Sequence, residues 1–326
     1  MEGIRDRAIV RNLFSEAYRN INIHIDEIEK REFGIGDFGK KIVYRHLAFR
    51  SESQLKNFLI ERTPIYISYS ISYYQHPDRP MDQKEYIRAD FAIDIDESLD
   101  RLNIIKQDIF ELYDILKSEF GLQRIVINYS GNRGFHIHVR DRWIQELSRD
   151  ARSAIIDYLI LRDVKIEDIG IIRKDNLLMG PRYENMKNRM QARLLRSIRE
   201  ITGNDRVYLG DWSDVDMQKF ALAVERSRFR ISMDSNVTLD QTKLLRMENS
   251  IHGDTGFIAK IIDINKLHDF DPWYDAVLFE DREIRVRMIE DYISKKYGVE
   301  LKRDHSYRLK GDLGVFLLLS NRAKLI

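Results

Sequence analysis

The sequence predicts an α+β fold, with a mixed β-sheet core and a helical subdomain alongside. Strand-like alternation and helical spacing follow one another through the first 147 residues, the middle of the chain has helical spacing, and alternation returns after residue 225. With 43% hydrophobic residues among 326, the chain can bury a substantial core. We expect the core to comprise residues 1–147 and 226–326, and a helical insertion to occupy residues 148–225.

The first elements are two helices and two strands. Apolar residues at helical spacing predict a helix over Val10–Tyr18, and Ser51 is placed to cap a short helix that ends at Ile60. Alternating or β-branched stretches predict strands over Lys41–Phe49 and Ile65–Tyr74.

From Arg88 the alternation becomes strict and predicts one strand with an acidic face. A helix is expected next over residues 102–120, with Gly121 at its C-terminal cap. Two strands, Arg124–Tyr129 and Phe135–Arg140, should follow around a glycine-bounded turn.

The later elements are expected in the following order: helices over Trp143–Leu161 and Tyr183–Ile201, alternating stretches over Arg228–Met233 and Gly256–Ile262, and a charged helix over Asp281–Tyr297 ended by Gly298. Helical spacing supports the three helices, and glycine is a common residue just after a helix.

Charge and composition exclude several classes of protein. The 54 Lys and Arg nearly balance the 53 Asp and Glu, so a polycationic binder is excluded and any nucleic-acid surface must be a local patch. The absence of cysteine excludes disulfides, Cys-ligated zinc and thiol catalysis. No apolar run approaches the roughly 20 residues of a membrane span, and the N-terminus lacks a signal-peptide core, so we expect a soluble, cytoplasmic protein.

Asp94 and Asp96 form the first candidate site. Residues i and i+2 of a strand share a face, with Cα atoms roughly 6.5 to 7 Å apart, so both carboxylates can reach divalent ions. Oxygen ligands favour Mg²⁺ or Mn²⁺ over zinc, and two such ions would suit phosphoryl transfer. The alternative is the solvated acidic edge of a sheet, and the pair alone does not decide between them.

The second candidate site is the turn and strand from Ser130 to His138. Backbone N–H groups of the turn, the Ser130 hydroxyl, the Arg133 guanidinium and His136 could together hold a triphosphate. An ordinary glycine-rich hairpin would show the same residues. We expect a structural role for His138.

The third candidate site lies between Met233 and Gly256. Asp234 could complete a carboxylate triad, and Arg246 and His252 could face phosphates. Taken alone, the segment is equally typical of a strand end, a capped helix and a turn.

A basic segment over residues 183–200 could contact nucleic-acid phosphates or could be the solvated face of a charged helix. We favour the solvated face because the chain is rich in charge throughout. The cationic residues concerned are Lys187, Arg189, Arg193, Arg196 and Arg199.

Taken together, these motifs resemble those of the catalytic small subunit of archaeal and eukaryotic DNA primase. The order and spacing of the motifs match as well as their residues. The matching segments are Phe91–Asp96, Tyr129–His136, Asp234–Thr238, Leu244–Arg246 and Ser250–His252, with weaker likeness at 31–33, 44–46 and 69–74.

The resemblance implies an archaeo-eukaryotic primase core that makes short RNA primers on single-stranded DNA for replication. It implies that Asp94, Asp96 and Asp234 are catalytic and bind Mg²⁺ or Mn²⁺. The residues implied to hold the phosphates of the incoming nucleoside triphosphate are Ser130, Arg133, His136, Arg246 and His252, with Arg45 a further candidate. The resemblance also implies a heterodimer with a large primase subunit and a prokaryotic, archaeal source.

One departure from the family is clear. Members usually carry a Cys-rich zinc-binding excursion near the Asp-x-Asp strand, whereas this chain runs from Asp96 directly into the helix at Leu102. Structural zinc is therefore not expected, through other ligands either. Two alternatives stay open: a related primase-polymerase of repair or of a mobile element that prefers dNTPs, and a non-catalytic nucleic-acid-binding subunit.

Overall fold

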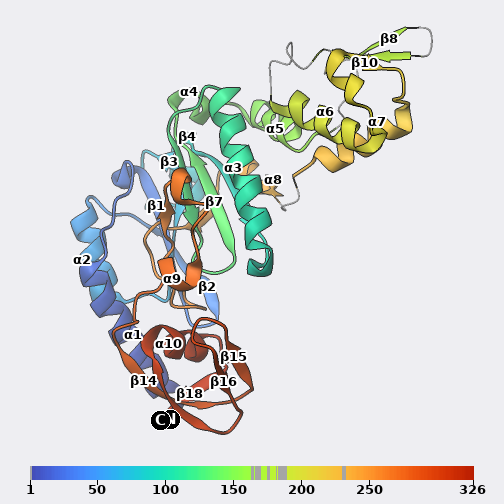
Figure 1. The fold of residues 1–326 in the computed structure, drawn as a ribbon. Coiled ribbons are helices and arrows are strands. Elements are labelled where there is room, and N and C mark those ends of the chain that lie inside the picture. Colours follow the sequence, from blue (N-terminus) through green and yellow to red (C-terminus); the bar gives the residue numbers. More distant parts are fainter. Residues whose placement is uncertain are drawn as a thin grey trace.

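The computed structural model describes residues 2–162, 165, 170–174, 177–180, 182, 189–229 and 233–326. Helices and strands are mixed along the chain, so the α+β class is confirmed. All strand pairs in this described part are antiparallel, so the expectation of a mixed sheet is wrong; several consecutive strands are joined by turns too short for a parallel crossover. Figure 1 shows strands in the middle of the molecule and helices on both sides of them.

The first sheet has the order β12-β3-β1-β2, with β4 also paired to β3. Its strands are β1 (Arg31–Asp37), β2 (Lys40–Leu47), β3 (Tyr66–Tyr74), β4 (Tyr86–Ala89) and β12 (Leu244–Arg246). Helices α1 (Glu2–Asn20) and α2 (Glu52–Arg62) cover its outer face, where Phe14 and Leu55 join Phe33 and Ile67 in one apolar cluster. Ser51 caps α2 as expected, because its side chain accepts a hydrogen bond from the N–H of Gln54.

The second sheet has the order β11-β5-β7-β6-β13 and carries most of the candidate site. Its strands are β5 (Phe91–Asp96), β6 (Ile125–Tyr129), β7 (Gly134–Val139), β11 (Met233–Asp234) and β13 (Ile261–Ile262). Helix α3 (Leu102–Ser118) covers its outer face, where Ile105 and Ile109 share a core cluster with Phe91 and Ile93. The two sheets therefore lie between α1 and α2 on one side and α3 on the other (Figure 1).

The chain passes from one sheet to the other at Asp90. The single strand expected from Arg88 is two strands, because Ala89 ends the pairing with β3 and Phe91 begins the pairing with Val139 of β7. The carboxylate of Asp90 is consequently enclosed between the sheets, while Asp96 at the far end is exposed. The acidic face of the expected strand is buried at one end and open at the other.

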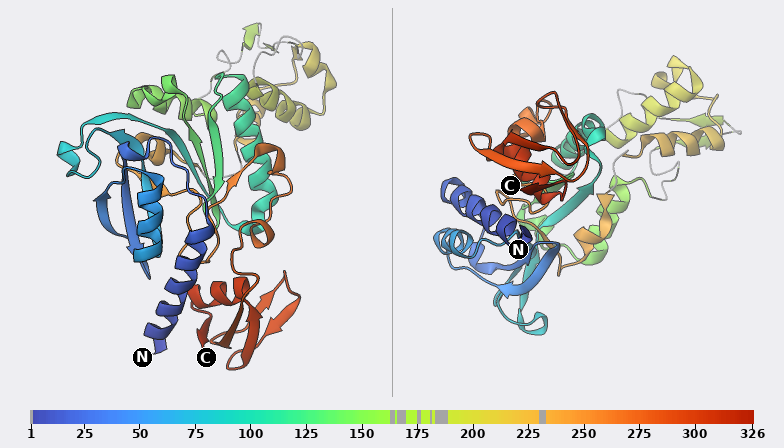
Figure 2. Two further views of the ribbon diagram at one scale, coloured as in Figure 1. Left: turned by 90° about the vertical axis from the view of Figure 1, so that its left-hand side faces the viewer. Right: turned by 90° about the horizontal axis from the view of Figure 1, so that it is seen from below.

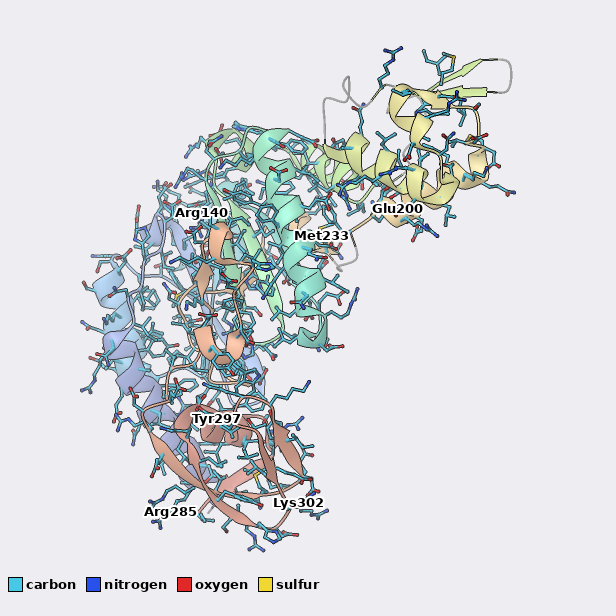
Figure 3. All side chains as sticks on the ribbon, in the orientation of Figure 1. Arg140, Glu200, Met233, Arg285, Tyr297 and Lys302 are labelled. Carbon is cyan, nitrogen blue, oxygen red and sulfur yellow. The ribbon has the colours of Figure 1, made fainter. Side chains whose placement is uncertain are left out.

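The middle of the chain contains short helices and strands. They are α4 (Arg142–Gln145), α5 (Arg149–Leu159), β8 (Ile172–Lys174), β9 (Leu177–Met179), α6 (Arg189–Thr202), β10 (Asp211–Trp212), α7 (Met217–Ser227) and α8 (Ser235–Leu239). Figures 1 and 2 show α6, α7, β8 and β10 projecting from the two sheets, and Figure 3 marks Glu200 within this arm. The division into 1–147, 148–225 and 226–326 stays a prediction.

One expectation for this region needs correction, and two others lie partly outside the described residues. The single helix expected over Trp143–Leu161 is two helices, because Ser148 begins a new one by accepting a hydrogen bond from the N–H of Ala151. The helix expected over Tyr183–Ile201 is present from Arg189, and its first six residues lie outside the described residues. Residues 230–232 of the strand expected before β11 also lie outside them.

The C-terminal residues form a module of their own beside α1. It contains β14 (Glu283–Met288), β15 (Tyr292–Ser294), β16 (Val299–Leu301), β17 (Ser306–Lys310), α10 (Gly311–Leu319) and β18 (Ala323–Leu325), and α9 (Pro272–Asp275) precedes it. The charged helix expected over Asp281–Tyr297 is wrong. Ile284, Val286 and Met288 are buried and alternate with exposed charged residues, which is the period of a strand.

Among the described residues, no helix is both long enough and apolar enough to cross a membrane. Figure 2 shows the two termini close together, at the end of the molecule where α1 meets the C-terminal module.

Candidate active site

Three carboxylates that are distant in sequence meet at one edge of the second sheet. Asp234 of β11 is the direct cross-strand partner of Asp94 of β5, and such partners have Cβ atoms about 4.5 to 5.5 Å apart on one face. Asp96 follows two residues later on the same face. The exposed fraction of the side chain rises from 25% for Asp94 to 41% for Asp234 and 57% for Asp96, so the group opens toward solvent.

Asp234 combines the two roles that its sequence context left open. Its side chain accepts a hydrogen bond from the N–H of Asn236 and so caps α8, while its residue pairs with Asp94 across the sheet. The cap fixes the carboxylate at the strand end, facing the other two acids.

The electrostatics of the three acids fit a divalent cation. Burial, and to a lesser extent repulsion from Asp96 and Asp234, raises the pKa of Asp94 to about 6, against a weaker opposing effect of Lys243 and Lys41. Clustered carboxylate oxygens are the ligands that Mg²⁺ and Mn²⁺ prefer, and a cation would relieve their repulsion.

In this arrangement the three carboxylates do not all point to one common position for a metal ion. In the parts of the chain that the structure describes, no group of three or more His, Asp or Glu side chains is arranged to hold a metal ion. The Asp96 carboxylate instead accepts two hydrogen bonds from Arg133, at 2.7 Å from Nε and 3.0 Å from Nη2. Asp96 would have to leave Arg133, at least in part, to join Asp94 around an ion.

The glycine turn after β6 contacts the loop that carries His252. Within the turn, the N–H of Ser130 donates to the carbonyl of Gly134 at 2.9 Å, and the N–H of Gly134 donates to the Ser130 hydroxyl at 3.1 Å. Gly131 has φ +88°, and a Cβ there would lie 2.7 Å from the Cβ of His252. The hydroxyl of Thr255 donates to the carbonyl of Gly131. The second and third sequence motifs therefore form one surface.

Two buried histidines lie on this surface. Nε2 of His136 is 3.5 Å from Oδ1 of Asp94, and its Nδ1 has no hydrogen-bond partner. Burial, together with smaller effects of His138 and Arg246, lowers the pKa of His136 to about 3. Burial also lowers the pKa of His252 well below its usual value, and the Nδ1 of His252 accepts a hydrogen bond from the N–H of Asp254. Both rings are therefore neutral at pH 7.

Arg246 is a buried cation without an anionic partner. One Nη donates to the carbonyl of Ile67 at 3.1 Å, the guanidinium lies 5.1 Å from the centre of the Tyr66 ring, and Nε has no partner. Among the described residues, no carboxylate lies within ion-pair distance of it, and burial lowers its pKa to about 10. It still carries a charge at pH 7. An unpaired buried charge is costly, so this site fits an anion.

Arg45 differs from Arg246 because acceptor groups of the protein already bind its guanidinium. Its guanidinium pairs with the fully buried Glu32 at 3.0 and 3.1 Å and donates to the carbonyl of Thr242 at 2.9 Å. His138 is also enclosed, 3.4 Å from Asp90 and stacked on Tyr69, as expected of a structural residue.

The basic segment of α6 is only partly a solvated face. Arg193 is buried, with its Nε 3.1 Å from Glu111 of α3 and its guanidinium over the Phe229 ring. Arg196 and Arg199 are exposed and lie near carboxylates of Glu111 and Asp205. Of the other cations named above, Lys187 lies outside the described residues, and the structure does not describe the side chain of Arg189.

Sequence reasoning missed two lysines near the carboxylates. Nζ of Lys243 is 4.0 Å from Asp234, and Lys41 of β2 is close enough to influence the pKa values of Asp94 and His252. Lys243 directly precedes the matched segment Leu244–Arg246 and could have been found from that position. Nothing in the sequence near Lys41 marks it, because only the packing of β2 against the other strands brings it to the site.

Comparisons with known proteins agree with the motifs. The model of the DNA primase small subunit family matches residues 91–264, more than half of the chain. The chain is 31% identical to the DNA primase small subunit PriS of Thermoplasma acidophilum, over 96% of this chain and 98% of that protein. It is 33% identical to PriS of Pyrobaculum islandicum over 77% of each, and 26% identical to PriS of Methanococcoides burtonii over 91% of this chain and 93% of the relative. The expected resemblance is confirmed, and the chain belongs to the DNA primase small subunit family, whose members are nucleotidyltransferases that make RNA primers.

Proposed function

We propose that the two sheets form the primase catalytic core. In this proposal the site formed by the three carboxylates and the neighbouring phosphate-binding surface catalyses synthesis of short RNA primers on single-stranded DNA. One observation carries the proposal: Asp94 and Asp234 lie directly opposite one another on neighbouring strands, beside a surface that holds the buried, unpaired cation Arg246. Such a site offers anionic ligands for metal ions and a cationic contact for phosphates, as nucleotidyl transfer requires.

In this proposal Asp94, Asp96 and Asp234 hold Mg²⁺ or Mn²⁺. Bound there, the ions would supply a lowered pKa for the attacking 3′-hydroxyl and neutralisation of the departing pyrophosphate. Binding of a cation would relieve the repulsion that helps to raise the pKa of Asp94, and this relief explains why three acids lie together at the edge of the sheet.

The phosphates of the incoming nucleoside triphosphate would lie against the Ser130 turn and the His252 loop. Arg246 gains in the phosphate the anionic partner that it lacks in the protein, and the two neutral histidines can each donate one ring N–H. The Arg133 side chain is exposed, so once it has left Asp96 it can bind a phosphate. Fixing the triphosphate in this way holds the α-phosphate in line with the attacking hydroxyl.

Arg45 is a weaker phosphate candidate by its contacts. Its hydrogen bonds link Glu32 to the carbonyl of Thr242, and so they hold in place the residue that precedes Lys243. We keep a nucleotide contact for Arg45 as a proposal that requires it to leave Glu32.

The partners in this proposal are a single-stranded DNA template, nucleoside triphosphates and a large primase subunit. The relatives are named as small subunits, and we extend that assembly to this chain.

The test is primer synthesis on an unprimed single-stranded template with Asp94→Asn and Asp234→Asn. Each change should lower the rate by several orders of magnitude, because charge stabilisation and ion placement are both lost. Both variants should remain folded without metal and should melt no lower than wild type, since a repulsive charge is removed. Asp150→Asn, at an exposed acid of α5, is the matched control and should synthesise primers normally. Wild-type rates for Asp94→Asn would refute the proposal.

A further inference from the structure

The outer face of the C-terminal sheet carries a dense set of cations. The sheet has the order β17-β14-β18, and its inner face packs apolar side chains against α10. Figure 3 marks Arg285 on the outside of this module and Tyr297 on the side toward the rest of the molecule. The exposed outward residues of the three strands are Arg285, Arg287, Arg308, Lys310 and Lys324, with Glu283 and Ser306. We call these residues the basic face.

Like charges lie directly opposite one another on the basic face. Arg285 is the cross-strand partner of Arg308, and Arg287 is the partner of Lys324. Direct cross-strand pairs of like charge destabilise a sheet, so the protein alone does not explain this arrangement.

Acidic partners are too few to balance the basic face. Arg308 has Glu283 at 3.6 Å and Arg287 has Asp304 at 3.7 Å, both between exposed side chains. Within the described ranges of the chain, no carboxylate lies within ion-pair distance of Arg285 or Lys310. The whole chain has a formal net charge of only +1, so this local excess of positive charge is a feature of the module.

A cleft extends from the basic face to residues that contact the candidate active site. Lys324 lines a cleft of about 710 Å³ between α1 and the module, and Tyr66 and Asp254 line the same cleft. Asp254 donates its N–H to His252, and the aromatic ring of Tyr66 lies beside both His252 and Arg246. Inside the module, Phe316 of α10 stacks on Phe257, which follows the His252 loop. A strand that leaves the active site along this cleft would reach the basic face.

We propose that the basic face binds the phosphate backbone of the single-stranded DNA template outside the catalytic site. Guanidinium groups pair well with phosphates, and the outward residues include no aromatic side chain on which a base could stack. Contact through phosphates alone is independent of sequence, as a primase template requires. The inference rests on the proposed function only for the identity of the strand.

The test compares Arg285→Gln/Arg287→Gln/Arg308→Gln with wild type in binding of a fluorescent single-stranded oligonucleotide, at several salt concentrations. Since each phosphate contact on a single strand contributes roughly 0.7 to the slope of log K against log[salt], we expect the slope to fall by about 2 and Kd near physiological salt to rise about tenfold or more. Lys310→Gln/Lys324→Gln, which alters the same face with other residues, should shift both quantities in the same direction.

A matched control removes the same number of cations elsewhere. Arg62→Gln/Lys117→Gln/Arg142→Gln changes three exposed residues on α2, α3 and α4 and should bind the oligonucleotide as wild type does. Extension of a primer on a template only a few nucleotides longer should be unchanged in the triple face variant, which keeps failure of this inference distinct from failure of the proposed function. Unchanged Kd and salt slope in both face variants would overturn the inference. Loss of large-subunit binding with normal DNA binding would also overturn it, in favour of an acidic protein partner.

Discussion

At the scale of single residues, Arg246 offers the sharpest separation of function from stability. Arg246→Met removes a buried charge without a counter-ion, and the carbonyl of Ile67 still accepts the N–H of Met247. We expect the free energy of unfolding without nucleotide to rise by about 1 kcal/mol or more, while kcat/KM for nucleoside triphosphates falls about 100-fold or more. Thermal unfolding with and without nucleotide, together with steady-state kinetics, measures both effects.

Arg45→Met is the matched control for this prediction. Glu32 is fully buried, so removal of its bidentate partner should lower the free energy of unfolding rather than raise it. A lower melting temperature for Arg246→Met would contradict the inference that the buried guanidinium destabilises the protein until an anion binds to it.

The residues of the site were predictable from sequence to different degrees. Strict strand alternation places Asp94 and Asp96 on one face, but only the other motifs distinguish a metal site from a solvated acidic edge. Asp234 was also consistent with a helix cap, and it is both a cap and a cross-strand partner. Lys41 could not be predicted, because its place depends on how β2 lies relative to a strand about fifty residues away.

At the scale of elements, the turn between β6 and β7 depends on its first glycine. Gly131→Ala would place a methyl group 2.7 Å from the Cβ of His252, in a backbone conformation with φ +88° that alanine rarely adopts. We expect a loss of about 2 to 4 kcal/mol in the free energy of unfolding and a large rise in KM for the nucleotide, because the His252 loop must move. Chemical denaturation and primer-synthesis kinetics test the two expectations.

Gly298→Ala separates backbone strain from displacement of the loop. Gly298 also has positive φ (+62°), but nothing lies within 4 Å of the added methyl group. We expect a loss of only about 1 kcal/mol and unchanged kinetics. Equal effects of the two substitutions would show that the contact between Gly131 and His252 is unimportant.

Gly298 also shows why one element was predicted incorrectly. A glycine after a charged, partly apolar stretch is typical of a helix end, yet here it turns the hairpin between β15 and β16. Ile284, Val286 and Met288 alternate with charged residues, which is the period of a strand. The alternation covers only the six residues of β14, so it was not recognised within the longer charged stretch. Around the site, α3, β6 and β7 have longer and clearer patterns and were predicted with small errors at their ends.

At the scale of the whole molecule, a buried network of charges joins the two sheets. Asp90 accepts hydrogen bonds from Arg31 of the first sheet at 2.9 Å and, at 3.4 Å, from Arg140, which lies just after β7. Arg140 also donates to the buried Glu248 at 2.6 Å. Sequence could not predict this network, because Asp90 looks like one more residue of a continuous strand, and only the crossing between sheets encloses it. Figure 3 marks Arg140 deep between the strands.

Asp90→Asn tests whether this network holds the sheets together. The change leaves Arg31 and Arg140 charged and buried with less compensation, so we expect the free energy of unfolding to fall by about 3 to 5 kcal/mol, a large share of the 5 to 15 kcal/mol typical of proteins. The guanidinium groups hold the pKa of Asp90 far below its usual value despite its burial. Asp90 therefore stabilises the fold above the unfolded pKa of about 3.9, and this contribution is lost as the pH falls below that value.

The variant should accordingly lose less stability than wild type when the pH is lowered from 5 to 3. Denaturant unfolding at several pH values measures the difference, and Asp281→Asn, at an exposed acid just before β14, is the control. Each folded Asp90→Asn molecule should keep its rate of primer synthesis at low temperature, since Asp90 contacts Arg31, Arg140 and His138, and none of these is a proposed phosphate or metal ligand. An unchanged unfolding midpoint at pH 7 would mean that apolar packing, and not the buried charges, holds the two sheets together.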